Sequence, residues 1–140
     1  MSLFLLDTDT LSLLEHRHPL VMQRVNSYPT SDIALSVISI QEQMQGLLSN
    51  LIRARNHQQI ALAYDLLVMR LLPVWCRFRV LSFPETAILR FEQLRSLRLN
   101  VGLMDLRIAA IALEANLTVV TRNQRDFGRV PGLATVDWSV

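Results

Sequence analysis

The 140-residue chain has no lysine and a single cysteine, Cys76. One thiol excludes an intrachain disulfide framework and any cysteine-rich zinc site. The apolar, arginine-flanked surroundings of Cys76 favour an inert buried thiol over a nucleophile. The absence of lysine excludes every mechanism that needs a lysine side chain. Four glycines and five prolines are too few for collagen-like or linker sequence.

Long hydrophobic runs are also missing. The longest segment without a charged residue is the ten residues 43–52, about half of the length needed to cross a bilayer. The N-terminal apolar stretch has no basic segment before it, and Asp7 and Asp9 follow it at once, so we do not expect it to be a secretory signal peptide. We therefore expect a cytoplasmic protein without a membrane partner.

The composition is typical of a folded protein. Hydrophobic residues make up 51% of the chain and charged residues 19%, which excludes disorder, and the length predicts one domain over residues 1–140. All 14 basic residues are arginine, against 12 acidic residues, for a net charge of +2. Arginine suits bidentate contacts with phosphate, although an all-arginine set also reflects genome base composition.

Short apolar runs and helical periodicities alternate along the chain. Runs typical of buried strands occur at 3–6, 33–36, 80–83, 117–121 and 134–138. Helical patterns occur at 10–15, 19–27, 37–53, 57–72, 84–97 and 103–116. Ser82-Phe83-Pro84-Glu85 combines a capping box with a proline in the first turn of its helix. Strands that alternate with helices predict an α/β fold with a parallel sheet covered on both faces.

Two of the predicted helices have unusual hydrophobic patterns. Segment 103–116 is apolar nearly all round, which predicts a buried helix. Segment 57–72 has apolar residues on more than one face. Apolar surface in excess of what one core can cover predicts that another subunit or a partner protein covers this helix.

Acidic residues follow the predicted strands. Asp7 and Asp9 come directly after the first strand, and Asp126 comes shortly after the fourth. Glu42 lies early in the helix after the second strand, and Asp105 lies near the start of the buried helix. Because the carboxyl ends of parallel strands meet at one edge of the sheet, we expect these acids, Asp9 aside, to converge there.

In such a cluster of acids, either some of the carboxylates are protonated or a cation neutralises them. Two carboxylates about 5 Å apart repel each other by roughly 3 kcal/mol at an effective dielectric constant of about 20. A site of oxygen ligands without Cys or His suits Mg²⁺, with Mn²⁺ as a substitute. The histidines His16, His18 and His57 lie away from these strand ends.

Each acid also has a purely structural interpretation. Asp7 or Asp9 can cap a helix, and Asp105 can complement the dipole at a helix N-terminus. Glu42 lies opposite the most apolar stripe of its helix, as a solvent-facing residue does. Asp126 can be a turn residue paired with a nearby arginine. The positions of the acids alone leave these interpretations open.

Four segments, taken together, match the motifs of a known family. The first two motifs correspond to Leu5–Asp9 and to Ile38–Glu42 with Gly46 shortly after. The third corresponds to Gly102–Ala112, and the fourth to Thr121–Phe127 followed by a tail at 130–133 and 137–138. In order, spacing and length these segments resemble PIN-domain proteins, and in particular the VapC toxins of bacterial toxin–antitoxin pairs.

The resemblance implies a three-layer α/β/α fold whose central parallel sheet has four or five strands. It implies a homodimer, a VapB-type antitoxin partner and Mg²⁺-dependent hydrolysis of RNA, either tRNA or rRNA. The acids implied for metal binding and catalysis are Asp7, Glu42, Asp105 and Asp126. The remaining implied site residues are Asp9, Thr121 and Asn123 as polar support and Arg107 or Arg122 as phosphate contacts. The family commonly has asparagine at position 9, and some members place the last acid at position 123.

Two other functions fit parts of the pattern. A PIN-like fold without activity would serve as a protein-binding module, and it would bind neither Mg²⁺ nor Mn²⁺. The Asp7-Thr8-Asp9 segment is also similar to that of haloacid-dehalogenase phosphatases, in which the first aspartate is the nucleophile. That family normally has threonine where this chain has Leu11, and its downstream basic residue is often a lysine, which this chain lacks.

Overall fold

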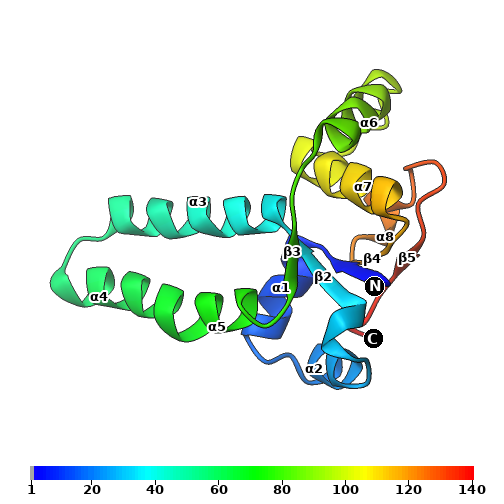
Figure 1. Ribbon diagram of the computed structural model, residues 1–140. Coiled ribbons are helices and arrows are strands. Elements are labelled where there is room, and N and C mark those ends of the chain that lie inside the picture. The colour runs from blue at the N-terminus through cyan, green and yellow to red at the C-terminus, as the bar shows by residue number, and fades with distance from the viewer. Residues whose placement is uncertain (1) are drawn as a thin grey trace.

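Five parallel strands form the centre of the molecule over residues 2–140, the part of the chain that the computed structural model describes. They are β1 (Phe4–Leu6), β2 (Ile33–Ser36), β3 (Arg79–Leu81), β4 (Thr118–Val120) and β5 (Thr135–Val136). Their order in the sheet is β3-β2-β1-β4-β5, so β1 lies in the middle and pairs with β2 and β4. The sheet confirms the predicted parallel α/β fold (Figure 1).

Both faces of the sheet are apolar, because successive residues of a strand point to opposite sides. In β1, Leu5 belongs to one hydrophobic core and Leu6 to the other, and Val119 and Val120 of β4 divide in the same way. All four side chains are fully buried. This two-sided burial fixes the register of the strands, and with it the residue at which each strand ends.

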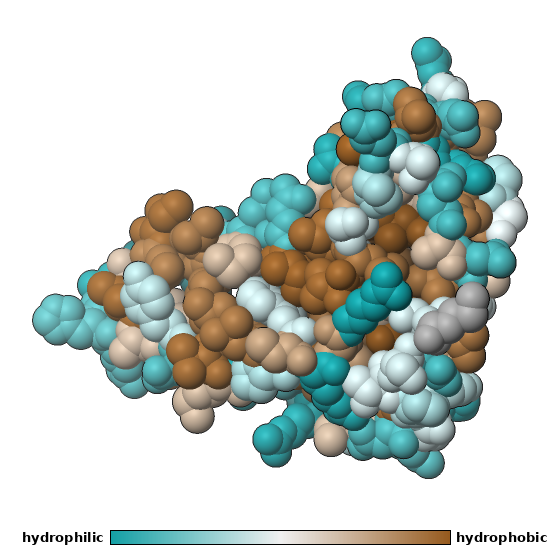
Figure 2. Space-filling view, in the orientation of Figure 1, coloured by the Kyte–Doolittle hydropathy of each residue, from teal (hydrophilic) through white to brown (hydrophobic). Residues whose placement is uncertain are grey.

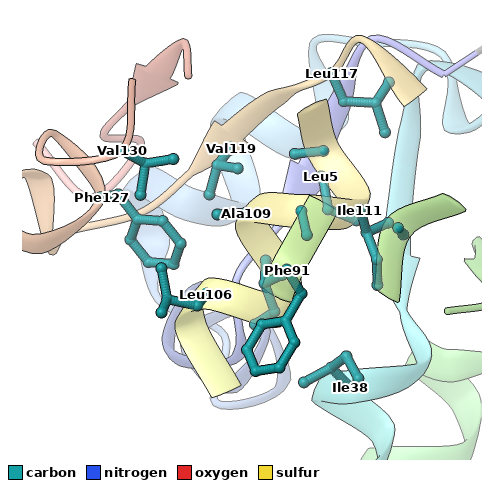
Figure 3. Close-up of a cluster of buried hydrophobic side chains, with 14 of the residues drawn as sticks. Leu5, Ile38, Phe91, Leu106, Ala109, Ile111, Leu117, Val119, Phe127 and Val130 are labelled. Carbon is teal, nitrogen blue, oxygen red and sulfur yellow. The ribbon is translucent and has the colours of Figure 1, made fainter. Parts of the chain in front are cut away.

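Helices cover the two faces and complete the three layers. One face is covered by α6 (Glu85–Ser96) and α7 (Leu103–Ala115), the other by α1 (Thr8–Glu15) and α2 (Pro19–Asn26). Figure 3 shows the first of these cores, in which Phe91 of α6 and Leu106 of α7 belong to one cluster with the strand residues Leu5 and Val119. The burial of α7 along its middle agrees with its apolar sequence.

An aromatic group closes the second core. Trp138 stacks on Tyr28 with ring centroids 5.4 Å apart, and it packs at a tilt against Phe4 at 4.8 Å. The prediction of a strand as far as Trp138 is wrong, since β5 ends at Val136. The Asp137 side chain accepts hydrogen bonds from the amide and hydroxyl of Ser139, and this turn ends the extended backbone.

An arm of helices projects from the sheet (Figure 1). It consists of α3 (Val37–Arg53), α4 (His57–Leu66), the π-helical turn η2 (Leu67–Leu71) and α5 (Leu72–Trp75). The single helix predicted over 57–72 is therefore interrupted. Pro73 supplies the reason, because it has no backbone N–H and its ring clashes with the carbonyl four residues earlier, so the preceding turn widens. Within residues 2–140 no helix combines the length and hydrophobicity needed to cross a bilayer.

Other local predictions are corrected by the backbone. The capping box expected from Ser82 does not form, and α6 begins after Pro84. A proline disfavours the helical conformation of the residue before it, so Phe83 cannot belong to the helix. Cys76 is exposed and not buried, because it lies in the turn after α5, between Trp75 and Phe78, whose side chains contact the second core. Two helices of a single turn were not predicted, namely η1 (Thr30–Asp32) and α8 (Gln124–Phe127).

A hydrogen-bond network joins the base of the arm to α1. The Gln43 side chain donates to Glu15 Oε1 at 2.5 Å and accepts from Trp75 Nε1 at 2.7 Å. Glu15 is 6% exposed, and among the described residues its Oε2 atom is buried without a hydrogen-bond partner. Burial raises the pKa of Glu15 to about 7, although the contacts with Gln43 and Trp75 act to lower it.

The buried carboxyl of Glu15 predicts a pH-dependent stability. Its pKa is about 7 in the folded protein, against an ordinary value of 4.5 that applies to the unfolded chain. Between these values the folded state binds more protons, so the free energy of unfolding falls as the pH rises through this window. At about 1.4 kcal/mol per pH unit, this single group lowers the free energy of unfolding by roughly 3 kcal/mol across the window.

Urea unfolding of the wild type and of Glu15→Gln, from about pH 4 to about pH 8, measures this contribution. Other titrating groups contribute equally to the two proteins, so the difference between their pH profiles isolates Glu15. We expect the decline to be smaller by that amount in Glu15→Gln. Parallel profiles for the two proteins would contradict the raised pKa.

Candidate functional site

Asp7 stands directly after β1, at the carboxyl edge of the sheet. Its Oδ1 atom accepts a hydrogen bond from the Thr10 amide at 2.8 Å and thereby caps α1. The residue is 3% exposed, and burial raises the pKa of its carboxyl, an effect that Thr121 and Thr10 partly offset. Asp7 is thus the aspartate that caps the helix, whereas Asp9 lies in its first turn.

Glu42 lies on α3 and is hydrogen-bonded across to α1. Thr8 Oγ1 donates to Glu42 Oε1 at 2.5 Å, and the same hydroxyl lies 2.9 Å from Ser39 Oγ. Glu42 is half-buried. A side chain held by a neighbouring helix in this way is not simply a solvent-facing residue.

Asp105 lies in the first turn of α7, close to the other acids. Burial, and after it the negative charges of Asp7, Glu42 and Asp126, raises the pKa of Asp105 to about 6. The dipole at a helix N-terminus favours a negative charge and therefore acts in the opposite direction. At neutral pH the fold holds these carboxylates together against their mutual repulsion.

Three of the four predicted acids line one open pocket with a volume of about 610 Å³. Its lining residues are Asp7, Thr8, Asp9, Ser12, Glu42, Asp105, Arg122 and Asn123. These residues are distant in sequence, and the carboxyl edge of the parallel sheet brings them together. The expected convergence therefore holds for Asp7, Glu42 and Asp105.

Asp126 is set back from this pocket, on α8. Its carboxylate accepts hydrogen bonds from Asn123 Nδ2 at 2.9 Å and from Arg129 Nη1 at 3.3 Å. The Asn123 side chain caps α8, and the backbone N–H of Asn123 donates to Oγ1 of the buried Thr121 at 2.8 Å. Asn123 therefore occupies the position facing the pocket, while Asp126 and Thr121 fix it from behind.

Asp9 and Arg122 form an ion pair at the rim of the pocket. The guanidinium donates through Nε to Asp9 Oδ2 at 2.7 Å and through Nη2 to Oδ1 at 2.9 Å. This contact raises the pKa of Arg122. Both side chains are about half exposed, and exposed pairs of this kind contribute little stability. Arg122 can therefore leave Asp9 and bind another acceptor with little loss of stability.

Arg107 does not line the pocket. Its guanidinium carbon lies 5.2 Å from the centre of the Phe91 ring, and Nη1 lies 3.3 Å from Met104 Sδ. Its Nε atom is buried, without a hydrogen-bond partner in the described part of the chain. Of the two arginines considered for phosphate binding, the structure brings Arg122 to the site and directs Arg107 into the packing between α6 and α7.

The donors of the pocket fit a hard divalent cation, because their ligating atoms are carboxylate, hydroxyl and amide oxygens. In residues 2–140, however, no three side chains of His, Cys, Asp or Glu are already arranged as a metal cage. Mg²⁺ commonly keeps several waters and binds through one or two carboxylates, which matches this open arrangement. The raised pKa values of Asp7 and Asp105 agree, since a cation would favour their charged forms.

Besides Thr121, three hydroxyl residues lie in the pocket or behind it and are not predicted from the sequence, namely Thr8, Ser12 and Ser39. Ser39 precedes Glu42 by three residues and Ser12 follows Thr8 by four, so each pair shares one helix face. This spacing was the available signal. The packing of α1 beside α3 brings these residues together, and the sequence spacing does not show that packing.

The chain is similar to proteins of known function and known structure. The PIN domain family matches residues 4–133. The chain is 29% identical to the tRNA(fMet)-specific endonuclease VapC of Salmonella typhimurium, over 96% of this chain and 97% of that protein. It is 26% identical to ribonuclease VapC1 of Haemophilus influenzae, over 98% of each. The crystal structure of DNA-bound VapBC from Salmonella typhimurium matches with a TM-score of 0.82 at 28% identity, over 99% of both chains.

The shared negative field of the pocket predicts how Asp105 titrates. In the metal-free protein its carboxyl should titrate near pH 6, and Asp7→Asn should lower this midpoint because one neighbouring charge is removed. Asparagine keeps the oxygen that caps α1, so the fold should be retained. Carbon-detected NMR of the aspartate carboxyls measures both midpoints. Equal midpoints in the two proteins would mean that the charge of Asp7 does not act on Asp105.

Proposed function

The chain belongs to the PIN-domain family, and on this premise we propose that it is a metal-dependent endoribonuclease, the toxin of a type II toxin–antitoxin pair. The convergence of Asp7, Glu42 and Asp105 on one open pocket is the observation that carries the proposal. Two relatives that match along nearly the whole chain are named as an endonuclease specific for a tRNA and as a ribonuclease. The proposed reaction is hydrolysis of a phosphodiester bond in tRNA or rRNA.

PIN-domain nucleases in general depend on a divalent metal, and we propose Mg²⁺ here, with Mn²⁺ as a substitute. Asp7 and Asp105 are the proposed main ligands, with Glu42 and Asp126 completing the acidic set. When bound, such an ion supplies a more acidic water and neutralises charge that develops on the phosphate.

The protein's own contribution is to hold these groups ready before RNA binds. Rotation of the Asp7 side chain out of the pocket would break the hydrogen bond by which its carboxylate caps α1. Glu42 is held by Thr8, and Asn123 is fixed between Thr121 and Asp126. Preorganised groups lower a reaction barrier because little rearrangement is needed during the reaction.

Arg122 is the proposed phosphate contact. Its guanidinium already forms two parallel hydrogen bonds with the Asp9 carboxylate, a geometry that phosphate oxygens can reproduce. Because the pair is exposed, a phosphate can replace Asp9. Arg107 is assigned to packing against Phe91, so phosphate binding is no longer proposed for it.

We also propose a homodimer and a VapB-type antitoxin as protein partner. The arm exposes apolar side chains, and Figure 2 shows hydrophobic surface over it. Four of these side chains, Leu62, Tyr64, Val68 and Met69, are 55% to 74% exposed. A groove of about 790 Å³ beside them is larger than the acidic pocket, but none of the four proposed catalytic acids lines it. We therefore assign this groove to the antitoxin, the kind of partner present in the matched VapBC structure.

Removal of either main ligand tests the nuclease proposal. Asp7→Asn and Asp105→Asn should each lower Mg²⁺-dependent RNA cleavage by more than about 100-fold, beyond the usual effect of losing a group that only supports a ligand. Both variants should stay folded, because each relieves repulsion in the pocket. Asp65→Asn, on the exposed surface of α4, removes the same charge elsewhere and should cleave like the wild type.

Thermal unfolding provides a second measurement. Mg²⁺ should raise the Tm of the wild type but not of Asp105→Asn, because a ligand stabilises only the protein that binds it. Full activity of Asp7→Asn would remove Asp7 from the mechanism. A folded wild type that binds neither Mg²⁺ nor Mn²⁺ would be an inert binding module, and a phosphate trapped covalently on Asp7 would indicate a phosphatase.

A charge placed on the arm tests the antitoxin surface. Met69→Glu, at a side chain that is 74% exposed, should weaken binding of the protein encoded by the adjacent short reading frame by at least about tenfold. Light scattering should still give a dimer, of twice 16.0 kDa, for both wild type and variant. A monomeric variant would mean instead that the arm is the surface between the two toxin subunits.

A further inference from the structure

A chain of hydroxyl groups runs from the end of β2 to Glu42. Ser36 Oγ lies 3.5 Å from Ser39 Oγ, and Ser39 Oγ lies 2.9 Å from Thr8 Oγ1. Thr8 Oγ1 lies 2.5 Å from Glu42 Oε1. Ser36 and Ser39 are fully buried, and Thr8 is half-buried. Residues of β2, α3 and α1 are thus connected to one carboxylate of the pocket.

Proton counting fixes the direction of these hydrogen bonds. Each hydroxyl has one proton to donate, and a carboxylate only accepts. Thr8 gives its proton to Glu42, so the Thr8 oxygen must accept from Ser39. Ser39 then has no proton left to give, and it accepts from Ser36. Every donor in the chain points toward Glu42, and the negative charge at its end polarises and strengthens such a series.

Thr8 links Glu42 of α3 to Asp7, the residue that precedes α1. It follows Asp7 in the chain and is the first residue of α1, so its hydroxyl ties Glu42 of α3 to the residue that caps α1. A free glutamate side chain would have several rotamers, most of which carry its carboxylate elsewhere. The hydrogen bond uses Oε1, and within the described residues no hydrogen bond uses Oε2, which is left for the pocket.

We infer that Thr8 is a positioning residue of this nuclease, whose hydroxyl, oriented by Ser39 and Ser36, holds Glu42 where its second oxygen serves the divalent ion. The inference rests on the proposed function. It gives Thr8 no contact with RNA or with the ion. Loss of the hydroxyl should therefore change metal affinity and turnover, and leave the affinity for RNA as it is.

Thr8→Val removes the hydroxyl at nearly constant shape, and Thr8→Ser keeps it. Binding of Mn²⁺ without RNA, followed by electron paramagnetic resonance of the free ion, should be about 10- to 100-fold weaker in Thr8→Val, the usual effect of losing support behind a metal-binding group. In cleavage assays kcat should fall and KM for RNA should not change. Thr8→Ser should restore Mn²⁺ affinity, and Thr86→Val, at an exposed threonine of α6, should bind Mn²⁺ like the wild type.

A double-mutant cycle tests whether Thr8 acts through Glu42. Glu42→Gln should weaken Mn²⁺ binding by itself, and Thr8→Val should then add little further loss. Additive losses would overturn the inference, because they would mean that Thr8 acts independently of Glu42. If Thr8→Val lowers the Tm, Ser39→Ala provides the same test with Thr8 in place, and a smaller loss of Mn²⁺ affinity is expected.

The two proposals fail in different ways. Equal Mn²⁺ affinity in the wild type and Thr8→Val would overturn the positioning role and leave the nuclease proposal standing. A wild type that binds Mn²⁺ but does not cleave RNA would overturn the nuclease proposal alone, because the metal titration contains no RNA. A wild type that binds no Mn²⁺ would overturn both.

Discussion

The register of β1 between β2 and β4 is the constraint on which the acidic pocket depends. Leu5 and Leu6 are fully buried on opposite faces, and a slip of one residue would carry the charged Asp7 into the apolar position of Leu6. Asp7 is the next residue, and it must therefore emerge at the carboxyl edge of the sheet. The carboxylates do not assemble themselves, since they repel one another. The hydrophobic cores above and below the sheet hold them in place.

This arrangement has a stability cost that is local to the site. Burial raises the pKa of Asp7 and, together with the nearby negative charges, that of Asp105, so their charged forms are less favourable in the folded protein than in the unfolded chain. A fold selected only for stability would place amides or apolar residues there. Proteins commonly accept such costs where a site must bind a charged ligand.

The sequence was most informative where topology alone decides a position. The placement of Asp7, Glu42 and Asp105 follows from strand ends and helix starts, which a parallel sheet always collects at one edge. It was less informative where a single turn decides, as at α8, whose cap puts Asn123 in front of Asp126. Helix geometry accounts for the place of Arg107 outside the pocket lining, because two residues after Asp105 on a helix is about 200° around its axis. The hydroxyl contacts to Glu42 depend on how α1 lies beside α3, which no local pattern encodes.

The helix that contributes Glu42 also forms half of the arm. At about 1.5 Å per residue, Glu42 lies about 7.5 Å from the start of α3, while its far end at Arg53 lies about 24 Å away. Glu42 therefore lies near the base of the helix, and Arg53 lies about three times as far from it. A swing of about 5° at its base would carry the tip by about 2 Å and Glu42 by less than about 1 Å. A partner bound at the end of the arm can therefore displace the tip while the Glu42 carboxylate, near the base of the helix, hardly moves.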